Sequence, residues 1–297
     1  MSAIDRSLTS QPEPDTRGVP TIDRVTAPPD SLFVPLDDDV VQPTEFARGP
    51  WDPGFLHGGP VSALLAHAVE QTDSNDVDWF VARMTVEMER PVPIAPLRMH
   101  AEVTRPGRKV SIVEATIARA DTDSVLARVR SLRIRNGDVP LPMDDAELAP
   151  LLAIEPPPPG PDHGRAGDVG QLDGVAFHNG GAEHRFIKGA GTDVGPVVDW
   201  IRLRMPLLPD VALTPLVRVA AAVDFANGIS HVLPWESYLF INPDLTLHQF
   251  RPLRGEWVGM ASATHHGERG IGMSDTAVFD IDGRIGRSSQ SLLLDRR

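Results

Sequence analysis

The chain repeats one order of structural elements, and this internal repeat constrains its fold more than any other feature. Each half contains one segment whose apolar residues recur at helical spacing, at 61–71 after Pro60 and at 216–226 after Pro215. Strand-like segments follow each helix, at 80–89, 97–105, 110–120 and 125–135 in the first half and at 236–250, 256–266, 271–281 and 285–295 in the second. The sequence therefore predicts two similar α+β halves.

Both predicted helices are apolar on most of their circumference, so other elements must cover each of them on several sides. An antiparallel sheet that curves around its single helix provides this cover, and two such sheets can join edge to edge. This arrangement is a double hot-dog fold, with one long apolar helix wrapped by each antiparallel sheet. A doubly wound parallel sheet fits less well, because it needs several amphipathic crossover helices and the sequence has only two good helices.

Two segments rich in proline and polar residues separate the parts of the chain. Residues 1–30 have almost no apolar periodicity and are predicted to be a flexible N-terminal tail. Residues 139–170 contain four consecutive prolines, which favour an extended linker. The two halves are expected at 31–138 and 171–297. In the second half, strand-like segments precede the helix at 174–180, 182–189 and 197–208.

Charge and composition exclude several classes of partner and site. With 28 Lys and Arg against 41 Asp and Glu, the net charge is −13, which argues against a nucleic-acid partner. The absence of cysteine excludes disulfides, thiolate zinc sites and a cysteine nucleophile. The longest apolar runs fall far short of the roughly 20 residues that membrane insertion requires, and the N-terminus lacks a signal-peptide core. We therefore expect a cytoplasmic protein.

Four segments carry a resemblance to a known family. They are WDPGFLHGGPVSALLAHAVE at 51–70, ERPVP at 89–93, NPDLTLHQFRPLRGEW at 242–257 and DGRIGRSSQSLLLDRR at 282–297. In this order they resemble the thioesterase-like superfamily of double hot-dog proteins, whose best-known relatives are type II acyl-CoA thioesterases. The resemblance implies hydrolysis of an acyl-CoA substrate to free acid and CoA, without a metal or redox cofactor.

Asp224 is the candidate general base. Its neighbours Val223 and Phe225 are apolar, so its carboxylate is expected to be partly desolvated near the end of the second helix, which suits general-base catalysis. An exposed aspartate at a helix end, or one bonded to the amide of Asn227, is the structural alternative. Aligning the helices on their prolines puts Val69 where the second half has Asp224, so the fold alone does not easily explain the acid.

Type II acyl-CoA thioesterases hold the attacking water with an Asp at the helix, a Thr on the following strand and a Gln on the last strand. Gln290 lies among leucines on the last predicted strand and matches the Gln, and the repeat puts Arg130 opposite it. A core glutamine bonded to backbone is the alternative. Counting back from the Arg-Pro pair at 251–252 puts Asn242 at the Thr position, whereas Thr246 is the nearest hydroxyl on the same face. The middle position stays open between these two residues.

The first helix opens with His57, Gly58 and Gly59, which are candidates for binding the thioester carbonyl. Backbone N–H groups at a helix N-terminus stabilise an oxyanion, and glycines let a ligand approach the backbone closely. A tight turn before the helix, with His57 as its cap, is the structural alternative. The resemblance implies that amides from the first half face Asp224 from the second half across the interface between them.

The sequence offers two alternative functions, an enoyl-CoA hydratase and a non-catalytic binding protein, and one candidate metal site. Asp224 and His231 faintly match the Asp-His pair of hot-dog enoyl-CoA hydratases, but they are seven residues apart. A non-catalytic acyl- or CoA-binding protein would keep the same fold, and the unmatched Thr position favours it. The adjacent His265 and His266 point to opposite faces of a strand, so no metal site is predicted. Free sheet edges lead us to expect a homo-oligomer.

Overall fold

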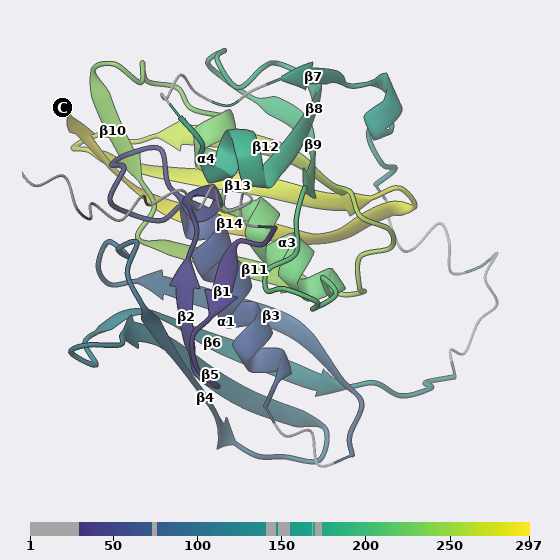
Figure 1. The fold of residues 1–297 in the computed structure, drawn as a ribbon. Coiled ribbons are helices and arrows are strands. Elements are labelled where there is room, and N and C mark those ends of the chain that lie inside the picture. Colours follow the sequence, from purple (N-terminus) through teal and green to yellow (C-terminus); the bar gives the residue numbers. More distant parts are fainter. Residues whose placement is uncertain (1–29, 73–75, 141–146, 148–154, 168, 170–173) are drawn as a thin grey trace, which may run out of the picture.

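The computed structural model describes residues 30–297 apart from 73–75, 141–146, 148–154, 168 and 170–173. The predicted tail at 1–30 therefore lies outside the described residues, except for residue 30. Figure 1 shows the strands of the first half, in purple and blue, beside those of the second half, in teal, green and yellow, with α1 and α3 packed together between them.

The first half contributes six strands and one long helix. Their bounds are β1 (Phe33–Pro35), β2 (Val40–Pro43), η1 (a short turn, Glu45–Ala47), α1 (Gly58–Glu70), β3 (Trp79–Met88), β4 (Leu97–Arg105), β5 (Val110–Arg119) and β6 (Val125–Arg135). The four strands after α1 confirm the strand-like segments predicted from the sequence.

Among its described residues, the second half contributes eight strands and two shorter helices. Their bounds are η2 (Pro161–His163), β7 (Arg165–Gly167), η3 (Phe177–Gly181), β8 (Ala182–Lys188), β9 (Val197–Leu203), α3 (Pro215–Val223), α4 (Ala226–Ile229), β10 (Tyr238–Ile241), β11 (Asp244–Gln249), β12 (Val258–His266), β13 (Ile271–Asp280) and β14 (Gly283–Arg296). The predicted segment 236–250 is divided into two strands, β10 and β11, with Asn242 and Pro243 between them.

The described strands form a single antiparallel sheet that runs through both halves. Its order is β1-β2-β4-β5-β6-β3-β11-β14-β13-β12-β9-β8-β7, and β10 pairs with β14 beside this path. The halves join at β3 and β11, where Thr85 faces Thr246. Outward from this junction, β6, β5 and β4 on one side mirror β14, β13 and β12 on the other. The repeat in the sequence is thus a repeat in the sheet.

The register shows which residues of the two halves correspond. Thr85 of β3 pairs with Arg130, and Thr246 of β11 pairs with Ser289. The counterpart of Arg130 is therefore Ser289, and the counterpart of Gln290 is Ser131. The alignment that put Arg130 opposite Gln290 is wrong by one residue. Because adjacent strand residues point to opposite faces, the correction matches Gln290 with a buried side chain rather than an exposed one.

The helices lie against the inner face of the sheet and against each other. α1 packs on β4, β5, β6 and α3, while α3 packs on β9 and β12 and α4 on β12 and β13. Ten residues of α1 are buried, which explains why its sequence is apolar on nearly every side. The helix predicted at 216–226 is interrupted, because α3 ends at Val223 and α4 begins at Ala226. Asp224 lies in this interruption.

Two segments before α3 differ from the sequence-based expectation. Residues 174–180 do not form the expected strand, because Phe177–Gly181 is a helical turn. The side chain of Asn179 accepts a hydrogen bond from the backbone N–H of Ala176, which closes the turn. Within the predicted linker at 139–170, the described residues include η2 and β7, and β7 pairs with β8. The sheet of the second half therefore begins before residue 171.

Candidate active site

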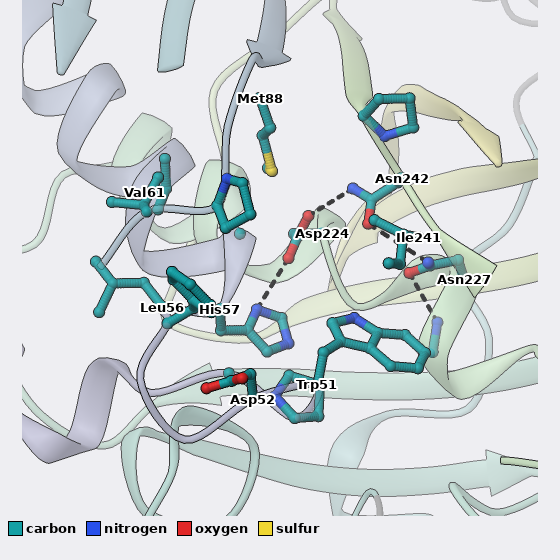
Figure 2. Close-up of a pocket in the computed structure, with 18 of the residues that line it drawn as sticks. Trp51, Asp52, Leu56, His57, Val61, Met88, Asp224, Asn227, Ile241 and Asn242 are labelled. Carbon is teal, nitrogen blue, oxygen red and sulfur yellow. Dashed lines mark hydrogen bonds and ion pairs between the residues drawn. The ribbon is translucent and has the colours of Figure 1, made fainter. Parts of the chain in front are cut away.

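A cavity of about 280 Å³ lies where the two halves meet. Its walls come from the loop before α1, the start of α1, the end of β3, the break between α3 and α4, and the segment between β10 and β11. Figure 2 shows Asp224 in the wall of this cavity, between His57 from the first half and Asn242 from the second. Most of the remaining wall is apolar and includes Trp51 and Trp235.

Asp224 is a buried carboxylate that faces the N-terminus of α1. Only 4% of its surface is exposed. Its Oδ2 lies 2.9 Å from His57 Nδ1, and its Oδ1 accepts a hydrogen bond of 2.9 Å from Asn242 Nδ2. The positive end of the helix dipole of α1 favours a negative charge at this point. The carboxylate is therefore held in one orientation, toward the cavity.

Two glycines allow this close approach of α1 to α3. A Cβ atom at Gly58 would lie 2.5 Å from Asp224 Oδ1, and a Cβ atom at Gly59 would lie 2.6 Å from Ala221 O. Real Cβ contacts are not this short, so any larger residue would displace the carboxylate or separate the helices. The glycines predicted to bind the thioester carbonyl thus also determine how close the base lies to the helix N-terminus.

His57 Nδ1 has two partners and can serve only one of them in a given protonation state. It lies 3.0 Å from the backbone N of Gly59, to which it can only be an acceptor, and 2.9 Å from Asp224 Oδ2. With a proton on Nδ1, His57 donates to the carboxylate, and without one it accepts from the Gly59 N–H. The bond to Asp224 and the cap of the Gly59 amide are therefore alternatives.

The structure brings Asn242, and not Thr246, to Asp224. Asn242 lies between β10 and β11, and its Oδ1 accepts a hydrogen bond of 3.4 Å from Asn227 Nδ2. The hydroxyl of Thr246 instead faces Thr85 at 3.4 Å across the junction of the two halves, and it is outside the described lining of the cavity. The chain breaks between β10 and β11, so strict alternation does not hold from Asn242 to Thr246. The two side chains therefore do not share the face that alternation assigns to both.

Gln290 lies behind the break between α3 and α4 and is 1% exposed. Its Oε1 accepts from Asn227 N at 3.1 Å, and its Nε2 donates to the carbonyl oxygens of Asp224 at 3.2 Å and Val223 at 3.5 Å. The amide is thus fully used by backbone groups that the helix break leaves without helical partners. This geometry matches the structural alternative for Gln290 and makes it a positioning residue for Asp224.

The first half does not repeat this carboxylate. The N-caps of α1 and α3 are His57 and Thr214, and aligning the helices on these caps puts His67, not Val69, at the position of Asp224. The alignment on the prolines is therefore displaced by two residues, because Pro60 is the third residue of its helix and Pro215 the first of its own. The conclusion that only the second half has the acid is unchanged.

His178 is a cavity residue that the sequence did not single out. It lies on the turn Phe177–Gly181, lines the cavity and is 2% exposed. Neither of its ring nitrogens has a hydrogen-bond partner among the residues that the structure describes. Its pKa is lowered to about 4, mainly by burial and also by the nearby His57, His184 and Arg48. The one signal in the sequence was the Asn-Gly-Gly run after it, which is typical of a turn.

The pKa of His178 predicts a stability change at mildly acidic pH. Below about pH 6.5 the unfolded chain binds a proton at this residue, whereas the folded chain does not until about pH 4. We therefore expect the free energy of unfolding to fall as the pH decreases from about 6.5 to about 4, by up to about 3 kcal/mol from this residue. Denaturant unfolding at several pH values measures the change.

The matched variant for this measurement is His178→Gln. It should lose part of the pH dependence and keep the remainder, because burial also lowers the pKa of His67 and of His231. Equal slopes for the wild type and the variant would contradict the assignment to His178.

Within the described ranges, no three His, Cys, Asp or Glu side chains lie close enough together to hold a metal ion. None of the helices that the structure describes has the length and hydropathy that a bilayer-spanning segment needs.

Family models match both halves of the chain. A model described as the acyl-CoA thioesterase N-terminal domain matches residues 47–133, and one described as the acyl-CoA thioesterase C-terminal domain matches residues 150–294. Together they span most of the sequence. None of the curated protein sequences compared with this chain matches it.

Solved structures resemble the whole chain. A hot-dog protein of unknown function from Alicyclobacillus acidocaldarius is 13% identical, with a TM-score of 0.66 over 90% of this chain and 97% of its own. A putative thioesterase II from Thermobifida fusca is 15% identical, with a TM-score of 0.64 over 90% and 96%. A putative thioesterase from Novosphingobium aromaticivorans is 19% identical, with a TM-score of 0.65 over 89% and 98%. At these identities the likeness shows the hot-dog fold alone.

Proposed function

The chain belongs to the thioesterase-like superfamily of double hot-dog proteins, and from this membership we propose that it hydrolyses acyl-CoA to free acid and CoA by direct attack of water. The observation that carries the proposal is the buried carboxylate of Asp224, which faces both the cavity and the glycine-rich start of α1. A base in the wall of a cavity, with amide donors close to it, is what hydrolysis of a thioester requires.

In this reaction Asp224 removes a proton from water as the water oxygen bonds to the thioester carbon. The carbonyl oxygen becomes an oxyanion, which the amides of Gly58 and Gly59 stabilise. The carbon–sulfur bond then breaks, and the proton on Asp224 is transferred to the CoA thiolate. His57 Nδ1 lies 2.9 Å from Asp224 Oδ2 and helps to hold the carboxylate beside the start of α1.

The remaining polar groups hold the base in position. Asn242 donates to Asp224 Oδ1 and occupies the position where the family has a threonine. Gln290 supports the backbone of Asp224 from behind. The domain boundaries, the extended linker and association into a homo-oligomer stay predictions.

The same site argues against the hydratase alternative. The imidazole beside Asp224 is that of His57, whereas His231 Nδ1 lies 2.9 Å from the carbonyl oxygen of Gly228 and its ring stacks on Phe240. A non-catalytic binding protein remains the second candidate, because Asn242 replaces the threonine of the family.

A thiol-release assay over a series of acyl-CoA chain lengths, alongside measurement of CoA binding, tests the proposal. A thioesterase releases thiol, a hydratase consumes enoyl-CoA without releasing thiol, and a binding protein does neither. Absence of thiol release from every substrate would refute the proposed hydrolysis.

The assignment of the family's Thr position to Asn242 rather than Thr246 gives a further prediction. Asn242→Leu removes the donor to Asp224 Oδ1, so we expect kcat for thiol release to fall by about 10-fold to 100-fold. Thr246→Val is the control, because its hydroxyl meets only Thr85, and it should stay within about two-fold of the wild type. Equal losses in the two variants would contradict the assignment of this position to Asn242.

A further inference from the structure

One polar side chain of the cavity lining, His178, has no role in the proposed hydrolysis. His178 is 2% exposed and has no hydrogen-bond partner for Nδ1 or Nε2 within the described part of the chain. Buried polar atoms are nearly always hydrogen-bonded, and leaving one unpaired is costly. Two unpaired nitrogens on a cavity wall therefore point to a bonding partner that arrives from the cavity.

His178 can both donate and accept a hydrogen bond. Its pKa of about 4 keeps the ring neutral near pH 7, and a neutral imidazole has one N–H donor and one acceptor nitrogen. A hydroxyl group can bond to either nitrogen, and a keto oxygen can accept from the N–H. Burial is the main cause of this low pKa, and the nearby His57, His184 and Arg48 add to it.

The rest of the wall accommodates hydrocarbon. Around His178 the cavity is lined mainly by apolar side chains, among them Trp51, Leu56, Met88 and Phe225. A plain alkyl group would fill this space and expel water, and both nitrogens would then stay without a partner. An acyl group that carries an oxygen would satisfy one of them. Sites built to bond a substrate hydroxyl discriminate strongly against the analogue that lacks it.

The thioester carbonyl is a less suitable partner for His178. The contacts recorded for the carboxylate of Asp224 are with His57 and Asn242, on other elements. In the proposed hydrolysis the carbonyl oxygen is bound by amides at the start of α1. His178 lies on the turn before β8, so it is available to a different part of the substrate.

We infer that the cavity selects acyl groups bearing a hydroxyl or keto oxygen on the chain, and that His178 binds this oxygen. The inference rests on the proposed function, since it names the class of acyl-CoA that the site prefers. It makes His178 a specificity-determining residue rather than a member of the hydrolytic machinery.

The test compares CoA thioesters of equal chain length that carry no oxygen, a hydroxyl or a keto group at C2, C3 or C4. For the wild type we expect kcat/KM to be at least about tenfold higher for one oxygenated member than for the plain acyl-CoA. His178→Leu should bring this ratio to within about two-fold of one. His178→Gln, whose amide keeps a donor and an acceptor, should restore part of the preference.

Two outcomes would overturn the inference. One is a wild-type enzyme with no preference for any oxygenated substrate. The other is an equal loss of kcat for all substrates in a folded His178→Leu variant, which would mean that His178 acts at the thioester carbonyl. Thermal melting of both variants establishes that they are folded, and His178→Gln alone decides the question if the leucine variant is not.

Binding of the corresponding free acids separates this inference from the proposed hydrolysis. Quenching of the fluorescence of Trp51 and Trp235 at the cavity wall reports such binding without turnover. If hydroxy acids bind more tightly than plain acids only when His178 is present, the inference stands even if no thiol is released. If thiol is released but the acids bind equally, the hydrolysis stands and the inference fails.

Discussion

Asp224→Asn should lower kcat for thioester hydrolysis by about 10²-fold to 10³-fold, with a smaller change in KM. The asparagine has nearly the same shape and can still accept a hydrogen bond from Asn242, but it cannot take a proton from water. Because the loss concerns a group that acts only in the transition state, it should affect kcat rather than binding. Steady-state thiol release measures both constants.

The control for this variant is Asp244→Asn. Asp244 is a partly buried carboxylate at the start of β11, and its Oδ1 accepts a hydrogen bond from Ser291 N. It is outside the described lining of the cavity, so this variant should keep kcat within a few-fold of the wild type. If Asp224→Asn behaves like Asp244→Asn, Asp224 is not the base.

Gly58→Ala should produce the second large effect. Its Cβ atom would lie 2.5 Å from Asp224 Oδ1 and 2.5 Å from Met88 Cε. The side chain of Met88 can move, but the carboxylate is held by His57 and Asn242, so the base must be displaced. We expect kcat/KM to fall by about 100-fold or more, because small displacements of a reacting group are costly in rate. Overpacking of this kind should also lower the free energy of unfolding, by about 1–3 kcal/mol.

Gly228→Ala is the matched control, since this glycine lines the same cavity on the opposite half. A Cβ atom there would meet only Trp235 Cζ2, at 3.8 Å, which is an ordinary van der Waals contact. We expect kcat/KM within about threefold of the wild type and a similar denaturation midpoint. An active Gly58→Ala enzyme would show that the base does not need its close approach to α1.

The repeat shows how far local patterns predict this fold. Periodicity predicted α1 and the strands after it, because helical and strand spacing depend on residues that are close in the chain. The same argument predicted one uninterrupted helix at 216–226, whereas the structure divides it at Asp224. Gln290 makes the division possible by bonding the backbone groups that it leaves free. A partner from the last strand is not visible in the helix sequence itself.

The candidate site shows the same limit. Asp224 could be identified because a charged residue stands out in an apolar helix. The choice between Asn242 and Thr246 depended on a break between β10 and β11, which strand alternation does not reveal. His178 was missed because its segment was expected to be a strand, and its importance comes only from the apolar cavity around it.

The amino-acid sequence alone determined α1, most of the strands, the duplication, and the single acid at the end of the second helix, because these follow from neighbouring residues. Tertiary structure decided which side chains meet that acid. It brought His57 from the other half to Asp224, turned Gln290 toward backbone, and placed an imidazole without a partner on the cavity wall. The physical reason is that burial and hydrogen bonding at the site join segments distant in the chain, and no local spacing specifies such contacts.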